Sequence, residues 1–206
     1  MFYCPEEESH GLALNPFKAL VIPRPIAWIS TVSRSGRVNL APFSYFNALA
    51  TDPPIVMFAT GGRAAKDSAI NARDTGEFVV NIVPEHLFAE MVSTSDEVGP
   101  QVDEAEMAGV DLRPSRVVHP PSVAASPINL ECSVIEQFDL PSDENGQPNK
   151  VTIGRVIGIH IDDAVINDGQ VDVRLIRPLA RLGYKEYAVV DRSTTLDSWL
   201  ARLNQE

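Results

Sequence analysis

The hydrophobic positions of this chain fall in short runs that are separated by polar and proline-rich turns. Five apolar or β-branched runs stand out, namely 26–32, 55–59, 77–83, 129–140 and 151–161. Runs of this length between turn residues are typical of β-strands. The last two runs predict a hairpin, because the polar segment between them contains Asn145-Gly146. Gly154 and Gly158 inside its second strand predict bulges or close approach by another backbone.

Further strands are predicted at Lys18 to Ile22 and at Tyr184 to Val190, with Arg177 to Gly183 as a link before the second of them. Three helices are also predicted, over 66–74, 84–92 and 194–203. Asp67 or Ser68 is the expected N-cap of the first helix, and Gly76 ends it. Most connections are too short for repeated parallel crossovers. We therefore predict a mainly β fold, a closed or split antiparallel barrel with a few short peripheral helices.

The stretch from Pro23 to Asn47 departs from the pattern of an ordinary core hairpin. A first strand, 26–32, is followed by a polar turn and a second run, 38–47. Pro42 removes a backbone donor from the second run, which predicts an edge strand, a bulge or the start of a loop. Such a strand exposes backbone N–H and C=O groups beside polar and aromatic side chains, here Ser44, Tyr45, Phe46 and Asn47. A flat, polar aromatic ligand needs that combination.

Composition narrows the class of protein. The chain has 206 residues, 44% of them hydrophobic, and a formal charge of −11. An acidic protein without a Lys/Arg cluster is not expected to bind nucleic acid. No apolar run is long enough to span a membrane, and no signal peptide is visible, so we expect a cytoplasmic protein. The four histidines are scattered without ligand spacing, and we therefore predict no metal site.

A local cationic patch stands out in this acidic chain. Arg63 and Lys66 flank the start of the helix that Asp67 and Ser68 open. The N-terminus of a helix presents unpaired N–H groups and a positive dipole end, which together favour a phosphate. The alternative is that Lys66 is an ordinary solvated lysine beside an ordinary helix cap. Likewise, Trp28, Tyr45 and Phe46 taken singly are more often core residues than residues that stack on a cofactor.

Several ordered motifs resemble one known family. RPIAWIST, NLAPFSYFNAL with the following DPP, KDSAINARDTGEFVVNIV, and SPINLECSV together look like the flavin reductase-like domain proteins. The resemblance covers about 18–190. It implies an FMN-binding, Greek-key split barrel, here over 18–206 with an N-terminal arm at 1–17. It also implies a homodimer with FMN near the subunit interface.

The resemblance further implies where FMN binds. Its phosphate would lie against Lys66, Asp67 and Ser68, together with Arg63. Its ring would lie along two segments, largely through backbone contacts. These segments are Trp28, Ile29, Ser30 and Thr31, and then Ala41, Pro42, Phe43, Ser44, Tyr45, Phe46 and Asn47.

The chain departs from better-studied flavin reductases at one position. Many of those carry Gly-Asp-His before the long returning strand, whereas this chain has Pro148-Asn149-Lys150. We therefore assign no catalytic residue. Whether His160, Arg181, Tyr184 or Tyr187 touches flavin or nicotinamide stays open.

The expected function is an FMN-dependent oxidoreductase. In it, NAD(P)H reduces the flavin, and electrons pass onward to an oxygenase or another redox protein. The first alternative is a flavoredoxin-like electron carrier that is reduced by a protein partner. The second alternative is a split barrel that has lost flavin.

Overall fold

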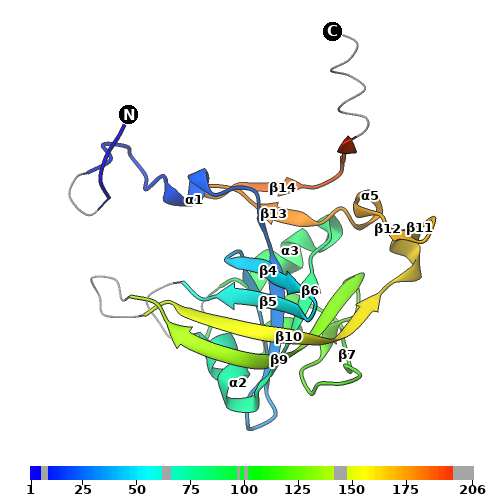
Figure 1. The fold of residues 1–206 in the computed structure, drawn as a ribbon. Helices are drawn as coiled ribbons and strands as arrows, with labels where there is room; N and C mark the ends of the chain where they lie inside the picture. Colours follow the sequence, from blue (N-terminus) through cyan, green and yellow to red (C-terminus); the bar gives the residue numbers. More distant parts are fainter. Residues whose placement is uncertain (6–8, 62–65, 97, 100–101, 142–147, 197–206) are drawn as a thin grey trace.

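The structure is a computed structural model that describes residues 1–5, 9–61, 66–96, 98–99, 102–141 and 148–196. Its centre is a seven-stranded antiparallel sheet in the order β3-β2-β6-β9-β10-β5-β4 (Figure 1). The strands are β2 (Ala27–Val32), β3 (Val38–Phe43), β4 (Phe46–Thr51), β5 (Pro54–Ala59), β6 (Glu77–Ile82), β9 (Ile128–Asp139) and β10 (Lys150–Ile161). Only Ser44 and Tyr45 separate β3 from β4, the two ends of this order. The sheet must therefore curl until its edges lie close together, as in an open barrel.

The predicted strand over 38–47 is in fact two strands, because the chain turns at Ser44 and Tyr45 between β3 and β4. The expectation for Pro42 is confirmed. β3 is an edge strand, and Pro42 pairs with Trp28 on β2 alone. An edge position tolerates proline because one side of the strand needs no ladder donor. Pro42 therefore marks the point where the barrel is open.

Two hydrophobic cores share the central strand β2. Ala27 and Ile29 belong to a core with the aromatic rings of Phe43, Phe58 and Phe78. Ile26 and Trp28 belong to a second core, whose other members are Leu40, Val83, Leu87, Met91, Ala105, Val123 and Leu179. Successive side chains of a strand point to opposite faces, so β2 is buried on both faces. This double burial explains its uninterrupted apolar run.

The predicted hairpin of β9 and β10 is confirmed, and the two strands pair over most of their length. The predicted turn at Asn145-Gly146 lies outside the described residues. Both glycine expectations are confirmed, since the register shifts between Ile153 and Gly154 and again between Val156 and Gly158. A Cβ atom on Gly154 would lie 2.4 Å from Cζ of Phe78. Gly154 is therefore required by the ring that packs over it.

Replacing Gly154 with alanine is expected to lower the free energy of unfolding by about 1–3 kcal/mol, the usual cost of overpacking a core. Phe78 is fully buried with its ring 5.2 Å from that of Phe58, so it has little room to move. Gly99→Ala is the control, because no atom lies within 4 Å of a Cβ added there and the backbone is not in the left-handed region. Urea unfolding followed by circular dichroism measures both variants. Equal losses would show that Phe78 does not impose the glycine.

A smaller three-stranded sheet lies above the barrel in Figure 1, in the order β1-β13-β14. It comprises β1 (Arg24–Pro25), β13 (Leu179–Arg181) and β14 (Tyr187–Val189). Two predictions were wrong here. The run 18–22 begins with a one-turn helix, α1 (Phe17–Leu20), because Phe17 N–H donates to Asn15 Oδ1 at 2.9 Å and the apolar side chains are exposed rather than buried in a sheet. The expected link over 177–183 contains β13, because its backbone pairs with both β1 and β14.

The predicted helix near Lys66 is α2 (Asp67–Thr75). Its N-cap is Lys66 rather than the expected Asp67 or Ser68, and it ends as predicted at Gly76, whose φ of 77° suits glycine. The expected helical stretch after Pro84 is a 3-10 turn, η1 (Glu85–Leu87), followed by α3 (Phe88–Ser93). The predicted C-terminal helix, 194–203, falls largely on residues that the structure does not describe.

The remaining elements are short. They are α4 (Glu104–Ala108), β7 (Leu112–Arg113), β8 (Ser122–Val123), η2 (Asp163–Val165), β11 (Ile166–Asn167), β12 (Gln170–Val171) and α5 (Val173–Ile176). None of the helices in the described parts of the chain is both long and apolar enough to cross a membrane.

A buried polar hub on β6 ties the barrel to the segment that contains β8. Asn81 is fully buried, and its Nδ2 donates to the carbonyl oxygen of Trp28 at 2.9 Å and to Ser30 Oγ at 3.2 Å. Its Oδ1 accepts from Val123 N–H at 2.8 Å and from Asn129 Nδ2 at 2.7 Å. All four hydrogen-bonding positions of this amide are thus used. Asn81 joins β2, β6, β8 and β9 at one point.

Candidate functional site

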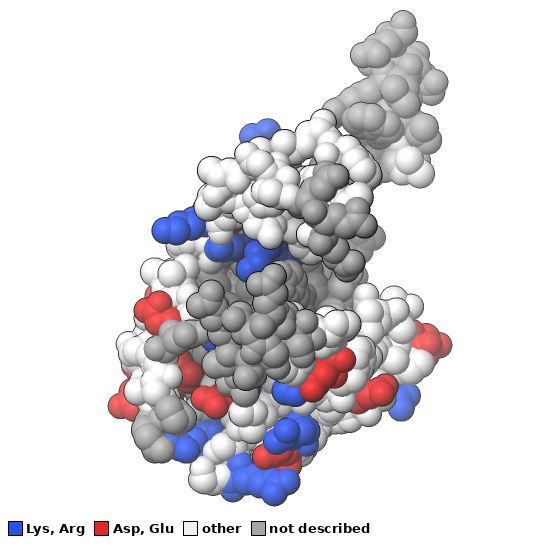
Figure 2. Space-filling view, turned by 90° about the vertical axis from the view of Figure 1, so that its left-hand side faces the viewer, with Lys and Arg blue, Asp and Glu red and all other residues white. Residues whose placement is uncertain are grey.

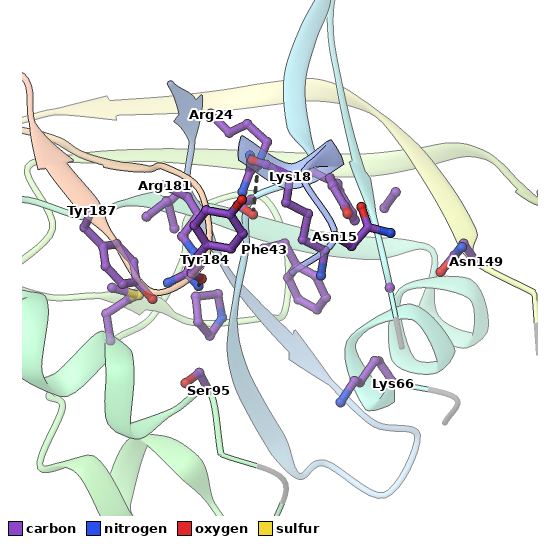
Figure 3. A pocket seen from close by; sticks show the side chains of 17 residues that line it. Asn15, Lys18, Arg24, Phe43, Lys66, Ser95, Asn149, Arg181, Tyr184 and Tyr187 are labelled. Atoms are coloured by element: carbon purple, nitrogen blue, oxygen red, sulfur yellow. Dashed lines mark hydrogen bonds between the residues drawn. The ribbon is translucent and has the colours of Figure 1, made fainter. Parts of the chain in front are cut away.

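A cavity of about 840 Å³ lies where the small sheet meets the open side of the barrel (Figure 3). Both sheets contribute to its walls, together with α1, α3 and the residue that caps α2. It is lined by Asn15, Lys18, Arg24, Ile26, Pro42, Phe43, Ser44, Tyr45, Ala59, Gly61, Lys66, Met91, Ser95, Asn149, Arg181, Tyr184 and Tyr187. Its size suits a cofactor or a substrate of ordinary dimensions.

The charge of this pocket is opposite to that of the whole protein. Four cationic side chains line it, from Lys18, Arg24, Lys66 and Arg181, and none of its described lining residues is Asp or Glu. The chain as a whole carries a formal charge of −11. On the face in Figure 2, Lys and Arg side chains are visible in the upper half, and the acidic side chains that are visible on this face lie lower. Such a concentration of positive charge attracts anions.

Arg24 lines the pocket and is only 7% exposed. Its guanidinium donates to the carbonyl oxygens of Lys18 at 2.5 Å, Val21 at 2.7 Å and Leu182 at 3.0 Å. Its Nε also donates to Ser44 Oγ at 3.4 Å. Each of these acceptors is neutral. Arg24 therefore holds α1 against the small sheet and the β3–β4 turn while leaving its positive charge in the pocket wall.

Arg181 and the turn that follows it form a second wall. The Arg181 guanidinium carbon lies 4.3 Å from the ring centroid of Tyr187, a cation–π contact, and the side chain donates to the backbone carbonyl of Tyr184. Tyr184 has a φ of 54°, a conformation that non-glycine residues seldom adopt. In this turn, Gly183 packs so closely on Ala19 that an added Cβ would lie 2.4 Å from Ala19 Cβ. The turn is thus seated firmly against α1.

Lys66 stands at the opposite side of the pocket, at the start of α2 (Figure 3). It is the N-cap of a nine-residue helix, so its side chain accompanies the positive end of the helix dipole. Ser68 is 1% exposed, and its Oγ lies 2.7 Å from the side-chain amide of Asn39. Asp67 lines a separate small cavity of about 60 Å³ beside Glu104. Of the three predicted phosphate residues in α2 and its cap, only Lys66 lines the main pocket.

The second segment that was predicted to lie along the flavin ring, 41–47, lines the pocket in part. Pro42, Phe43, Ser44 and Tyr45 line it. Ala41 and Phe46 pack against the aromatic core, and Asn47 is exposed on β4. Arg63 lies outside the described residues.

The first segment that was predicted to lie along the flavin ring, 28–31, does not line the pocket. Trp28, Ile29, Ser30 and Thr31 are fully buried in β2, which lies between β3 and β6. Trp28 Nε1 donates to Thr94 Oγ1 at 2.8 Å, and Ser30 Oγ donates to the carbonyl oxygen of Pro121 at 2.5 Å. β2 is an interior strand, and Ser30 pairs with Leu40 on β3 and with Val79 on β6, so its backbone is not exposed to the pocket. Direct contacts of these residues with FMN stay a prediction.

The sequence left open whether four residues touch flavin or nicotinamide. Three of them, Arg181, Tyr184 and Tyr187, line the pocket, and His160 does not. His160 lies on β10, where burial, together with Arg113 and Arg116, lowers its pKa. Sequence reasoning missed several lining residues, notably Asn15, Lys18 and Arg24. The one available signal was Arg24 itself, a charged residue between two prolines at the start of an apolar run. Within the described residues, no group of three or more His, Cys, Asp or Glu side chains could hold a metal ion.

An antiparallel open barrel with a cationic pocket beside its edge strand defines this protein as a split-barrel protein, and the predicted fold class is confirmed. The family model for the flavin reductase like domain matches residues 19–180. The chain therefore belongs to the flavin reductase like domain family. A relative from Halalkalibacterium halodurans, an uncharacterized protein, is 37% identical over an alignment of 190 residues, and the match covers 90% of this chain and 90% of that protein.

Solved structures support the same assignment. Nitrilotriacetate monooxygenase component B from Bacillus cereus has a TM-score of 0.88 and 29% identity, with 95% of this chain and 98% of that chain covered. The 2-nitrobenzoate 2-nitroreductase NbaA of Pseudomonas fluorescens has a TM-score of 0.83 and 27% identity, with 95% of each chain covered. Family and neighbours together indicate a flavin-related redox role.

Proposed function

We propose that this protein binds FMN in the cationic pocket and acts as an NAD(P)H-dependent flavin oxidoreductase that passes electrons onward. The observation that carries the proposal is the pocket itself. It is lined by four cations without a described carboxylate, it begins at the start of α2, and it runs beside the aromatic residues of the β3 edge. This arrangement fits a ligand with a phosphate at one end and a flat, polar ring.

The residues present fit FMN in two respects. Lys66 stands at the positive end of the α2 dipole and is therefore suited to the phosphate. Phe43 and Tyr45 supply aromatic surface, and Ser44 and the edge of β3 supply polar groups. Close packing also favours glycine at position 61 in the pocket wall, since a Cβ on Gly61 would lie 3.2 Å from the Tyr45 ring. FMN would thus be held between α2 and the β3–β4 turn.

When bound, FMN supplies the capacity to accept a hydride and to release electrons singly or in pairs. The protein then needs only to bind and orient the reactants and to exclude water. No acid–base pair is required for hydride transfer, which agrees with the absence of an assigned catalytic residue. The apolar part of the wall, from Ile26, Phe43 and Met91, would limit the entry of water.

An onward partner is supported by the similarity to a protein named as component B of a monooxygenase. We therefore propose an oxygenase or another redox protein as the electron acceptor. The Gly-Asp-His motif, which many flavin reductases carry, is Pro148-Asn149-Lys150 here, and Asn149 lines the pocket. This difference favours the alternative of an FMN electron carrier that is reduced by a protein partner.

We also propose a homodimer with the pocket near its interface. Several large apolar side chains close to the pocket are exposed, among them Leu14 at 59%, Phe17 at 62% and Leu20 at 69%. The unpaired edge of β3 lies nearby, and a second subunit would cover both. Sedimentation analysis tests this part of the proposal: a monomer at micromolar concentration would contradict it.

A visible absorption spectrum of the purified protein, after supplementation with FMN and removal of free flavin, tests the proposed function. We expect a flavin band at about 450 nm. Bleaching of this band within minutes of adding NADH or NADPH supports the reductase, and an unchanged band supports the carrier. A colourless protein without FMN affinity would overturn both.

A further inference from the structure

We infer that Arg24 and Arg181, with Lys18, form a second anion-binding subsite that selects an anionic second substrate, one that carries a phosphate or a carboxylate group. The inference rests on the proposed function for the place of FMN, whose phosphate is assigned to Lys66. It goes further by naming a separate set of residues and the chemical class of the molecule that meets the flavin. The argument depends on four observations about these cations.

The first observation is a pair of arginines directly opposite each other in the small sheet. Arg24 on β1 is the register partner of Arg181 on β13. Directly opposed residues of antiparallel strands project on the same face, and like charges in such a pair are destabilising. Both side chains line the main pocket. Two adjacent positive charges are thus held at one end of a cavity whose described walls contain no carboxylate.

The second observation concerns Arg24, whose charge has a fixed position. Its guanidinium is nearly buried and donates to three carbonyl oxygens and one hydroxyl. These hydrogen bonds orient the side chain but do not neutralise it. In the interior of a protein, where screening is weak, such a charge acts strongly on nearby groups. Arg24 is therefore a positioning residue that raises the positive potential of the subsite.

The third observation concerns Arg181 and Lys18, which can contact an anion directly. A guanidinium has five N–H donors, and the hydrogen bond to Tyr184 uses one of them. The Tyr187 ring supports the guanidinium plane, so the side chain is already oriented. Its planar fork suits bidentate binding of phosphate or carboxylate. Lys18 adds an ammonium group from α1.

The fourth observation is that this cluster is separate from Lys66. In Figure 3, Arg181 and Tyr187 lie on one side of the pocket, and Lys66 lies on the other, with Phe43 between them. A cavity of about 840 Å³ lies towards the upper end of the range of about 300 to 1,000 Å³ that small-molecule pockets span. We therefore place the anionic group of the second molecule at the arginine pair and its apolar part towards the flavin.

Calorimetric titration with two probes, NADP⁺ and benzoate, tests the inference on FMN-supplemented protein. NADP⁺ represents a phosphate source and benzoate a carboxylate source. We expect at least one probe to bind, and Arg181→Gln and Lys18→Gln each to weaken that probe about tenfold, the effect of about 1.4 kcal/mol. Lys185→Gln is the matched control, since this lysine lies in the same turn but is exposed and outside the pocket.

The two proposals fail in different ways. The FMN dissociation constant is measured separately for each variant, and Arg181→Gln should leave it unchanged. Failure of the parent protein to bind FMN would contradict the proposed function. Titration of the same protein with NADP⁺ and benzoate would still test the arginine pair. Weakening of NADP⁺ alone identifies a phosphate ligand, and weakening of benzoate alone identifies a carboxylate ligand. If neither probe binds, or if Lys185→Gln weakens binding as much as Arg181→Gln, the subsite inference is overturned.

Discussion

Replacement of Asn81 with leucine is expected to lower the free energy of unfolding by about 3–5 kcal/mol. The substitution removes four hydrogen bonds inside a fully buried site. It leaves the backbone N–H of Val123 and the side-chain amide of Asn129 without their acceptor, and each buried unsatisfied group costs about 1–3 kcal/mol. Leucine also differs in shape, so the packing around Trp28 must adjust. Chemical unfolding followed by tryptophan fluorescence measures the loss.

Asn47→Leu is the matched control for this variant. Asn47 lies on the edge strand β4 and is exposed, and its Oδ1 accepts a local hydrogen bond from Ala48 N–H at 3.0 Å. Its replacement is expected to change the free energy of unfolding by about 0.5 kcal/mol or less, as is usual for surface positions. Similar losses in the two variants would show that the hub does not stabilise the barrel.

Replacement of Lys66 with alanine is expected to weaken FMN binding by about 1.5–3 kcal/mol, the usual range for a hydrogen bond to a charged group. This corresponds to a rise in the dissociation constant of roughly 10- to 150-fold. Lys66 caps α2 and lines the pocket, so its ammonium group and the helix dipole act on the same anion. Fluorescence titration of the apoprotein with FMN measures the constant.

Arg73→Ala is the control for the lysine variant, because it removes a cation from the same helix far from the pocket. Arg73 lies in the last turn of α2, where its side chain pairs with Asp74 at 2.8 Å. Its loss should leave FMN affinity unchanged. A second comparison is riboflavin, which lacks the phosphate. It should bind the parent protein and the Lys66 variant equally, and unchanged FMN affinity in the variant would place the phosphate elsewhere.

Local patterns were sufficient for most of the barrel. The β9–β10 hairpin, β6, and the glycine that ends α2 follow from apolar periodicity and turn chemistry, which act over a few residues. Errors arose where an apolar run is not buried. The run after Phe17 resembles a strand, but the hydrogen bond from Phe17 N–H to the Asn15 side chain and the carbonyl contacts of Arg24 make its start a helical turn. Such contacts join residues that composition alone does not relate.

Local patterns also predicted part of the site. Lys66 and the segment 42–45 were identified because a helix start and a proline-marked edge are visible in sequence. The cationic cluster of Arg24, Arg181 and Lys18 was not, since β1 and β13 are separated by more than 150 residues and meet only through sheet pairing.

The sequence by itself determined the antiparallel barrel, the exclusion of Pro42 from an ordinary interior strand, and the family, because these depend on short-range patterning and ordered motifs. Only the tertiary structure decided which of the predicted residues face the pocket. It buried Trp28 to Thr31 between two neighbouring strands and brought four cations together in an acidic chain. The physical reason is that burial and the meeting of charges depend on strand order, which is settled by long-range pairing and not by local preference.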